Sequence, residues 1–386
     1  MRLSDRVAKV PKSGIREIFD RAELMKDVIN LGIGEPDFNA PRFVELSAER
    51  AIRSGLGKYT PNAGILELRE EISKKLKREN GISADPRSEI LVTSGATQAI
   101  FVAMGCLLNP GEEILVPTPA FPAYRYCASL AGGKCLGVPS RESEGFSPDI
   151  EAMEKACTSK TRVLVINSPA NPTGSVLGRK TIEKACELAL SKDLILITDE
   201  IYEKFLYEGA EHFSAASLEE FRDRIITING FAKTYGMTGW RLGYAAGPSE
   251  IINAMIRFNM YNAVCATSFV QYAGVTALKH SLAFFKSILS RYQKKRKIIC
   301  EFLDRHGWGF QKPHGAFYVF PKLPENYRTD SLSFSLNLLE SKRVATIPGS
   351  SFGETGEGHI RISYSLEERE LRRALTGVEQ FTRDRS

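Results

Sequence analysis

The sequence predicts an α/β fold, in which a mostly parallel, seven-stranded sheet lies between helices and a smaller α+β domain follows. Three observations predict it. Seven short apolar, β-branched runs recur between residues 89 and 246, and helix-like stretches separate most of them. Such alternation indicates parallel strands with both faces covered. A mostly helical segment without proline follows at 249–312, and two further apolar runs lie nearer the C-terminus.

Each apolar run has the length of one strand, and the helical stretches fall between them. The expected strands are 89–93, 113–116, 135–138, 162–167, 194–198, 225–228 and 242–246, and the clearest helices are 97–108, 150–157 and 181–192. Only a loop around Lys233, without a crossover helix, joins the last two strands. These two strands therefore either pair antiparallel or lie apart.

Beyond the sheet, apolar residues recur three or four apart from 283 to 303, which predicts a long helix entering a second domain. The runs 315–320 and 359–363 are expected to be strands of that domain. We expect an N-terminal arm that forms part of the small domain, then the large domain, then the small C-terminal domain. Their predicted bounds are 1–40, 41–280 and 281–386.

Composition excludes several classes of protein. The 52 basic and 46 acidic residues are interspersed, so the net charge of +6 indicates a slightly basic surface and not a nucleic-acid site. The densest basic run, 291–297, falls in a helical pattern and predicts a solvated helix face. No run approaches the ~18 apolar residues of a membrane span. Seven cysteines without metal-type spacing predict free thiols, no bound metal and a cytoplasmic location.

Polar residues end several of the predicted strands. In an open α/β sheet, ligands bind beyond the carboxyl ends of the strands, and Asn167, Asp199 and Asn229 each lie there. Asp199 follows an apolar run, so it is either an exposed cap or a buried carboxylate that needs a partner. Tyr202 is three residues on and can share a face with it.

Lys233 lies between an apolar strand and a glycine-rich turn. A loop lysine is usually a solvated charge. Here, however, Arg241 follows eight residues later and could bind a phosphate through two parallel hydrogen bonds. Gly95, Ala96 and Thr97 open a helix after a strand. This turn is either an ordinary helix cap or an anion cradle at the helix N-terminus.

Three further residues have an ordinary and a functional interpretation. Asn171 lies in a proline-rich turn and is either turn punctuation or an amide for a ring oxygen. Phe121 is either a core residue or a ring that stacks on a ligand. Arg361 lies in an apolar strand, where it either points outward or forms a fork for a substrate carboxylate.

Together these residues supply an amine, an acid for a pyridinium nitrogen, a phenol and an amide for a ring oxygen, and arginines for a phosphate and a carboxylate. That set is what pyridoxal 5'-phosphate needs from a protein.

The same motifs carry a family resemblance. Over its full length the chain resembles the class I/II aminotransferases, which are fold-type I pyridoxal-phosphate enzymes. It is most similar to the archaeal aromatic-amino-acid aminotransferases, through residues 3–6 and 260–265. The matching stretches, in order, are 31–38, 58–64, 68–70, 171–174, Asp199 with Tyr202, 233–243, 348–353 and Arg361.

The resemblance implies a role for each residue. Lys233 would hold the cofactor covalently and then shuttle a proton, with Asp199 on the ring nitrogen. Tyr202 and Asn171 would bind the ring oxygen. The phosphate would be held by Gly95, Ala96, Thr97, Arg241 and Tyr59 of a neighbouring subunit, and the substrate carboxylate by Gly34, Asn171 and Arg361. The resemblance also implies a homodimer with shared sites. Two positions depart from many relatives, which have a hydroxyl residue at Ala232 and tryptophan at Phe121.

The expected reaction moves an amino group between an L-amino acid and a 2-oxo acid. Ile15, Ile33, Phe121 and Tyr261 are candidates for an apolar pocket wall, and no second arginine stands in a suitable motif. Aromatic donors are therefore favoured, with 2-oxoglutarate as acceptor. Aspartate aminotransferase and a fold-type I carbon–sulfur lyase are the alternatives. A ligand-sensing transcription regulator is disfavoured, because no DNA-binding domain is expected before the arm.

Overall fold

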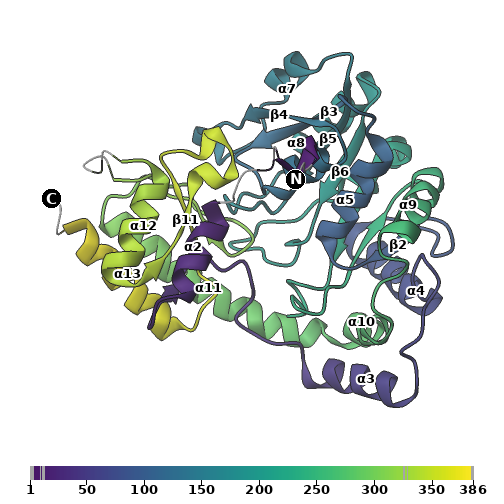
Figure 1. Ribbon diagram of the computed structural model, residues 1–386, viewed down its shortest axis with the longest axis horizontal. Coiled ribbons are helices and arrows are strands. Elements are labelled where there is room, and N and C mark those ends of the chain that lie inside the picture. Colours follow the sequence, from purple (N-terminus) through teal and green to yellow (C-terminus); the bar gives the residue numbers. More distant parts are fainter. Residues whose placement is uncertain (1–3, 9, 11–13, 325–326, 328, 384–386) are drawn as a thin grey trace.

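The structure, a computed structural model, describes residues 4–8, 10, 14–324, 327 and 329–383. A large part is built around a sheet, and a smaller part holds the C-terminal helices (Figure 1). The long helix α11 (Leu282–Arg305) runs from one to the other, as the sequence predicts. Residues 1–3, 9 and 11–13 of the predicted arm, and with them part of the 3–6 motif, lie outside the described residues.

All seven predicted strands are present in one sheet, in the order β2-β8-β7-β6-β5-β3-β4. β8 pairs antiparallel with both of its neighbours, and the remaining pairs are parallel. The two strands joined by the Lys233 loop therefore pair with each other. The strands are β2 (Ile90–Thr93), β3 (Glu113–Thr118), β4 (Lys134–Pro139), β5 (Thr161–Asn167), β6 (Ile195–Asp199), β7 (Ile225–Gly230) and β8 (Gly243–Ala246).

Both faces of the sheet are buried. Successive side chains of a strand point to opposite faces, so one strand contributes to the apolar core on each side. In β5, Leu164 and Ile166 belong to one apolar core, whereas Val163 and Val165 belong to another. The covering helices include the three predicted ones, α5, α7 and α8. The helices of this part are α3 (Arg42–Arg53), α4 (Leu66–Lys75), α5 (Ala96–Leu107), α6 (Ala123–Leu130), α7 (Ile150–Ala156), α8 (Arg179–Ser191), α9 (Ser249–Asn262) and α10 (Ser268–His280).

The smaller part has its own short strands and core. The predicted strand at 359–363 is β12, whereas only two residues of 315–320 are in a strand, β9. The N-terminal segment joins this part, because β1 pairs with β10 and α2 packs on α12. The bounds of the three predicted domains stay a prediction. The elements are α1 (Asp5–Ala8), which lies near α6, and α2 (Gly14–Glu23), β1 (Ile29–Asn30), β9 (Tyr318–Val319), α12 (Ser331–Lys342), β10 (Val344–Ala345), β11 (Ile347–Pro348), β12 (Ile360–Ser363) and α13 (Glu368–Arg383).

The prediction of a solvated face for the basic run in α11 is wrong at two positions. Lys295 is 3% and Arg296 5% exposed. The Lys295 ammonium binds the Asp37 carboxylate, and the Arg296 guanidinium binds both carboxylate oxygens of Glu208 at 2.7 and 2.9 Å. Such pairing offsets the cost of burying a charge. The contact between Lys295 and Asp37 also holds the segment that follows Gly34 against α11.

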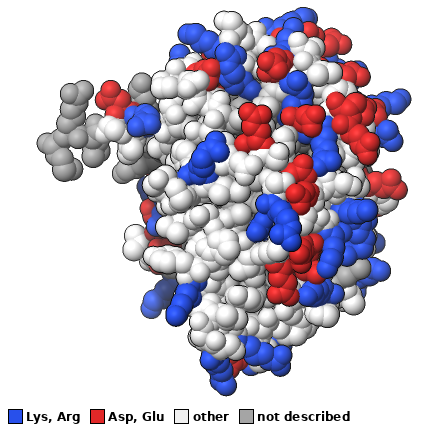
Figure 2. All heavy atoms as spheres, turned by 90° about the vertical axis from the view of Figure 1, so that its right-hand side faces the viewer, with Lys and Arg blue, Asp and Glu red and all other residues white. Residues whose placement is uncertain are grey.

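The surface agrees with the interspersed charge of the sequence. On the face shown in Figure 2, basic and acidic side chains are mixed over the described residues. Among the described residues, no helix is long and apolar enough to cross a membrane. The cytoplasmic location stays a prediction.

Candidate active site

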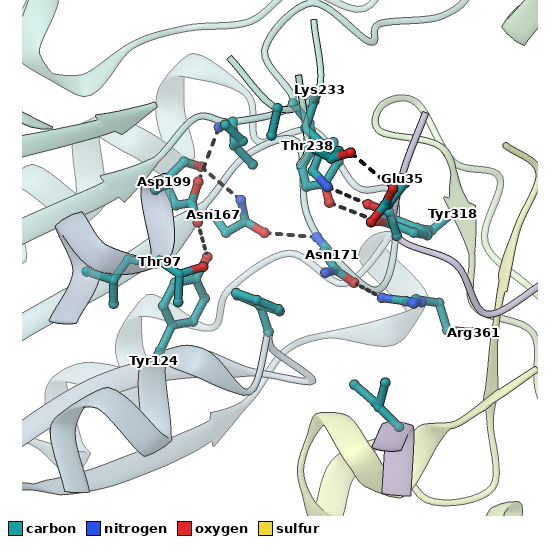
Figure 3. Close-up of a pocket in the computed structure, with 18 of the residues that line it drawn as sticks. Glu35, Thr97, Tyr124, Asn167, Asn171, Asp199, Lys233, Thr238, Tyr318 and Arg361 are labelled. Carbon is teal, nitrogen blue, oxygen red and sulfur yellow. Dashed lines mark hydrogen bonds between the residues drawn. The ribbon is translucent and has the colours of Figure 1, made fainter. Parts of the chain in front are cut away.

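A cavity of about 450 Å³ lies beyond the carboxyl ends of the parallel strands. Asn167 ends β5, Asp199 ends β6 and Lys233 follows β7, so three neighbouring strands deliver polar side chains to one place. The smaller part closes the other side through residues of α2, β9 and β12, including Arg361 (Figure 3). The site thus lies between the two parts of the chain.

Lys233 points its amine into this cavity and donates a hydrogen bond to the carbonyl of Gly34. Burial lowers the pKa of Lys233 to about 8. The negative charge of Glu35 opposes this shift, and the positive charges of Arg361 and Arg241 add to it. A lysine with such a pKa is partly neutral near pH 7, as a nucleophile or proton acceptor must be.

Asp199 is a buried carboxylate, 4% exposed, with both oxygens held. Tyr124 donates its hydroxyl proton to Oδ2 at 2.7 Å, and the Ile201 N–H donates to Oδ1 at 3.2 Å. Burial raises the pKa of Asp199 to about 6, although these two hydrogen bonds lower it. A buried carboxylate of this kind favours a cationic N–H partner.

Arg361, on β12, is a buried fork with one nitrogen that has no hydrogen-bond partner among the described residues. Its Nη1 donates to Asn171 Oδ1 at 2.9 Å and its Nη2 to the Gly32 carbonyl at 2.6 Å. Its Nε is buried without a hydrogen-bond partner in the described structure. The guanidinium also lies 4.4 Å from the ring of Tyr318 and 5.2 Å from that of Phe352. An unpaired buried donor beside a cavity fits a carboxylate ligand.

The turn before α5 has a geometry that suits an anion. Gly95 has φ +88°, and a Cβ there would lie 2.5 Å from Nη2 of Arg241. Arg241 itself has φ +55°, which is uncommon for a residue other than glycine and occurs at functional sites. The first N–H groups of α5, from Ala96 and Thr97, lack intrahelical acceptors. Together with Arg241 they fit a phosphate.

Two tyrosines meet beneath Lys233. The hydroxyls of Tyr202 and Tyr318 lie 2.8 Å apart in a hydrogen bond. Burial raises the pKa of Tyr202 well above its ordinary value, so this phenol keeps its proton and can donate it. Its ring also lies 5.5 Å from the Lys233 amine. The pair therefore presents a hydroxyl donor to the same cavity.

Most of the predicted site residues come together here. The cavity is lined by Gly34, Ala96, Thr97, Phe121, Asn171, Asp199, Tyr202, Lys233, Arg241 and Arg361, and by the predicted wall residue Ile15. Gly95 lies against Arg241, at the edge of this lining. Among the described residues, Ile33 does not line the cavity, contrary to its prediction. Tyr59 and Tyr261 lie outside it and are 84% and 87% exposed.

Sequence reasoning missed several lining residues, namely Phe19, Glu35, Tyr124, Tyr318 and Thr238. Asn167 was recognisable from the sequence as a possible site residue, because it ends a predicted strand. In the structure its side-chain amide donates a hydrogen bond to the Asp199 carbonyl at 2.8 Å. Tyr318 lies in the aromatic run 315–320, so its position near the second domain's sheet was visible but its contacts were not.

The fold and these contacts define an α/β protein with a candidate active site around Lys233. A family model of aminotransferase class I and II matches residues 26–378. The chain is 46% identical to an aspartate aminotransferase of Pyrococcus abyssi over 387 residues, which covers 100% of this chain and 99% of that one. It is 41% identical to aromatic-amino-acid aminotransferase 2 of Thermococcus litoralis, again with 100% and 99% covered.

The solved structures agree. A crystal structure of an aromatic aminotransferase from Pyrococcus horikoshii OT3 superposes with a TM-score of 0.91 at 46% identity, covering 95% of this chain and 99% of that one. The chain belongs to the class I and II aminotransferases, and it is an aminotransferase of fold type I.

Proposed function

We propose that the chain uses pyridoxal 5'-phosphate to move an amino group between an L-amino acid, with aromatic donors favoured, and 2-oxoglutarate. One observation carries the proposal. Lys233, Asp199 and Arg361 line one cavity, beside the turn where Gly95 lies against Arg241, and Nε of Arg361 has no hydrogen-bond partner among the described residues.

The residues present fit this cofactor. Asp199 would accept the ring N–H, and Tyr202 and Asn171 would bind the ring oxygen. Phe121 would lie against the ring. The phosphate would be held by Gly95, Ala96, Thr97 and Arg241. When bound, the cofactor supplies a protonated pyridine ring that takes up electron density from the substrate's α-carbon.

The chain's own side chains would do the rest. Arg361 would hold the substrate carboxylate, with Gly34 beside it, and so orient the α-carbon toward Lys233. The Lys233 amine, with its pKa lowered to about 8, would take a proton from one carbon and return it to another. Asp199, kept in place by Tyr124, would keep the ring nitrogen protonated.

The cavity wall supports an apolar substrate side chain. Ile15 and Phe19 of α2 line it, as does Phe121. In the described part of the chain, its only basic lining residues are Lys233, Arg241 and Arg361, and all three already have a role. Aspartate is a second candidate donor, because the 46% identical relative is an aspartate aminotransferase.

A donor comparison tests this choice. We expect tyrosine and phenylalanine to have higher kcat/KM than aspartate, with 2-oxoglutarate as acceptor. An apolar wall discriminates by only about 1–3 kcal/mol per methylene-sized change, so several apolar donors should react. Half-reactions followed by the loss of cofactor absorbance give the ranking. An aspartate value about tenfold or more above both aromatic values would make aspartate the donor and leave the aminotransferase assignment intact.

Arg361→Lys should raise the KM of every amino acid about 10- to 100-fold, since lysine offers no planar fork and charged hydrogen bonds contribute about 1.5–3 kcal/mol. Steady-state kinetics with tyrosine, phenylalanine and aspartate measure the effect. Arg16→Lys, an exposed change on α2, is the control. If KM rose for one donor class only, Arg361 would bind a side chain and not the shared carboxylate.

Exposed apolar residues support a homodimer. Leu56 and Tyr59 precede Asn62, whose side chain donates to the Val264 carbonyl at 2.9 Å, so this segment lies beside the end of α9. Exposed apolar residues gather on both segments, which is typical of an interaction surface. The group comprises Leu56, Tyr59, Met260, Tyr261 and Val264. Tyr59 would then reach the cofactor phosphate of the neighbouring subunit.

Subunit mixing tests the shared site. A hybrid of Tyr59→Phe and Lys233→Ala protomers would combine Lys233 of one with Tyr59 of the other, and so hold one complete site. At limiting cofactor, we expect its activity to exceed that of either parent. Native mass spectrometry verifies subunit exchange. Activity no higher than both parents, with exchange verified, would show that Tyr59 does not serve the neighbouring site.

A further inference from the structure

Tyr318 contacts two groups that the proposed function assigns to different ligands. Its side chain is fully buried on β9. Its ring lies 4.4 Å from the Arg361 guanidinium, and its hydroxyl forms the 2.8 Å hydrogen bond with the hydroxyl of Tyr202. One side chain thus touches both the fork for the substrate carboxylate and the phenol for the cofactor's ring oxygen.

The direction of the hydrogen bond follows from counting protons. A tyrosine hydroxyl has one proton to donate. If Tyr202 gives its proton to the ring oxygen, its own oxygen must accept, so Tyr318 is the donor. Burial raises the pKa of Tyr318, which therefore keeps that proton, while the Arg361 charge acts in the opposite direction and strengthens the donor.

The Tyr318 ring is fixed from several sides. Tyr318 on β9 is paired with Ser363 on β12, and Ser363 follows Arg361 by two residues. It packs edge-on against Tyr202, with ring centroids 5.6 Å apart. Its hydroxyl also lies close to Gly34, where an added Cβ would be 3.1 Å away. The hydroxyl therefore has little freedom to turn elsewhere.

We propose that Tyr318 is a positioning residue that links the substrate fork to the cofactor-binding phenol, by stacking on Arg361 and donating a hydrogen bond to Tyr202. The inference rests on the proposed function through the roles of those two residues. Chains of hydrogen bonds strengthen one another by about 10–30% per bond, so Tyr202 is a better donor with Tyr318 behind it than alone.

The chain offers variants that separate loss of the Tyr318 hydroxyl from loss of a ring beside Arg361. Tyr318→Phe keeps the ring on Arg361 but removes the hydroxyl from Tyr202. Phe352→Leu removes a ring 5.2 Å from Arg361, and that ring pairs with Phe320 and not with Tyr202. Tyr207→Phe is the control for loss of a buried hydroxyl, because Tyr207 donates to the Ala316 carbonyl at 2.6 Å.

Two readouts on the cofactor-loaded protein are needed, neither of which is turnover. The first is the pH midpoint of the cofactor absorbance. A hydrogen bond donated to the ring oxygen stabilises the charged, deprotonated oxygen, so the midpoint rises when such a donor is lost. The second is the Kd of an unreactive carboxylate. Both 3-phenylpropanoate and succinate are tried on the wild-type protein, and the one that binds more tightly is used for all variants.

Tyr318→Phe should raise the pH midpoint by about 0.3–0.5 pH units. Tyr202→Phe should shift the midpoint in the same direction and by more. Tyr318→Phe should change the Kd of the carboxylate less than about twofold. Phe352→Leu should weaken the carboxylate about two- to fivefold, the value of a lost cation–ring contact, without moving the midpoint. In a Tyr202→Phe background, Tyr318→Phe should have no further effect on the midpoint. Tyr207→Phe should change neither readout.

The inference is overturned if Tyr318→Phe leaves the midpoint at the wild-type value, or if its shift persists in the Tyr202→Phe background. It is also overturned if Tyr202→Phe itself causes no shift. A wild-type chain without cofactor absorbance would instead overturn the proposed function, so the two failures are distinguishable.

Discussion

Lys233→Ala is expected to reduce turnover by at least about 10⁴-fold and to abolish covalent retention of the cofactor. One amine serves as both covalent anchor and proton shuttle, and general acid–base catalysis alone contributes about 10²–10⁴-fold. No described neighbour can replace it, because the other basic lining residues of the cavity are arginines. The measurements are kcat with tyrosine and 2-oxoglutarate, and the cofactor that remains after gel filtration.

The lowered pKa adds a pH test to this prediction. Below about pH 8 the neutral fraction of Lys233 rises tenfold per pH unit, so the rate of covalent cofactor uptake by the cofactor-free chain should rise with it and level off above. Lys160→Ala, at an exposed lysine before β5, is the control and should change neither turnover nor uptake. Turnover of Lys233→Ala within about tenfold of wild type would refute the assignment.

Asp199→Ala should weaken cofactor binding and slow proton abstraction by about 10³-fold. The lost interaction is electrostatic stabilisation of the charge that develops on the ring, for which single groups contribute about 2.7–4 kcal/mol. Single-turnover rates at saturating cofactor separate this effect from weaker binding. Asp193→Ala removes a carboxylate with 95% of its side chain exposed, at the other end of the same strand, and should have no effect.

The neighbouring Tyr124 sharpens the prediction for Asp199. Its hydroxyl is one of two donors that keep the buried carboxylate charged, so Tyr124→Phe should raise the pKa of Asp199 above about 6 and slow the same step to a lesser degree. Near-normal single-turnover rates in Asp199→Ala would show that this carboxylate is only structural.

The sheet and the centre of the site were predictable from the sequence for one reason. A strand buried on both faces is a continuous apolar run, so the polar residue that ends it is conspicuous, as Asp199 is at the end of β6. Lys233 was recognisable because it follows such a run and precedes glycines. The antiparallel pairing of β7 with β8 needed the structure, since the sequence left two arrangements open.

What the sequence did not reveal depends on contacts between distant residues. Tyr124 lies on α6, a short helix that follows three prolines, and its partner is 75 residues away. The Tyr318 hydroxyl meets Tyr202 across 116 residues. Lys295 seemed solvated because its partner Asp37 is 258 residues away. Ile33 was a candidate for the pocket wall because it is apolar, but it is not among the residues that line the cavity.

The most direct test of the account is to locate the covalent attachment. The purified protein, loaded with pyridoxal 5'-phosphate, is reduced with borohydride, digested and mapped by mass spectrometry. We expect one modified lysine, Lys233, and no covalent adduct in Lys233→Ala. An adduct on any other lysine, or a loaded protein in which borohydride fixes no cofactor, would contradict it.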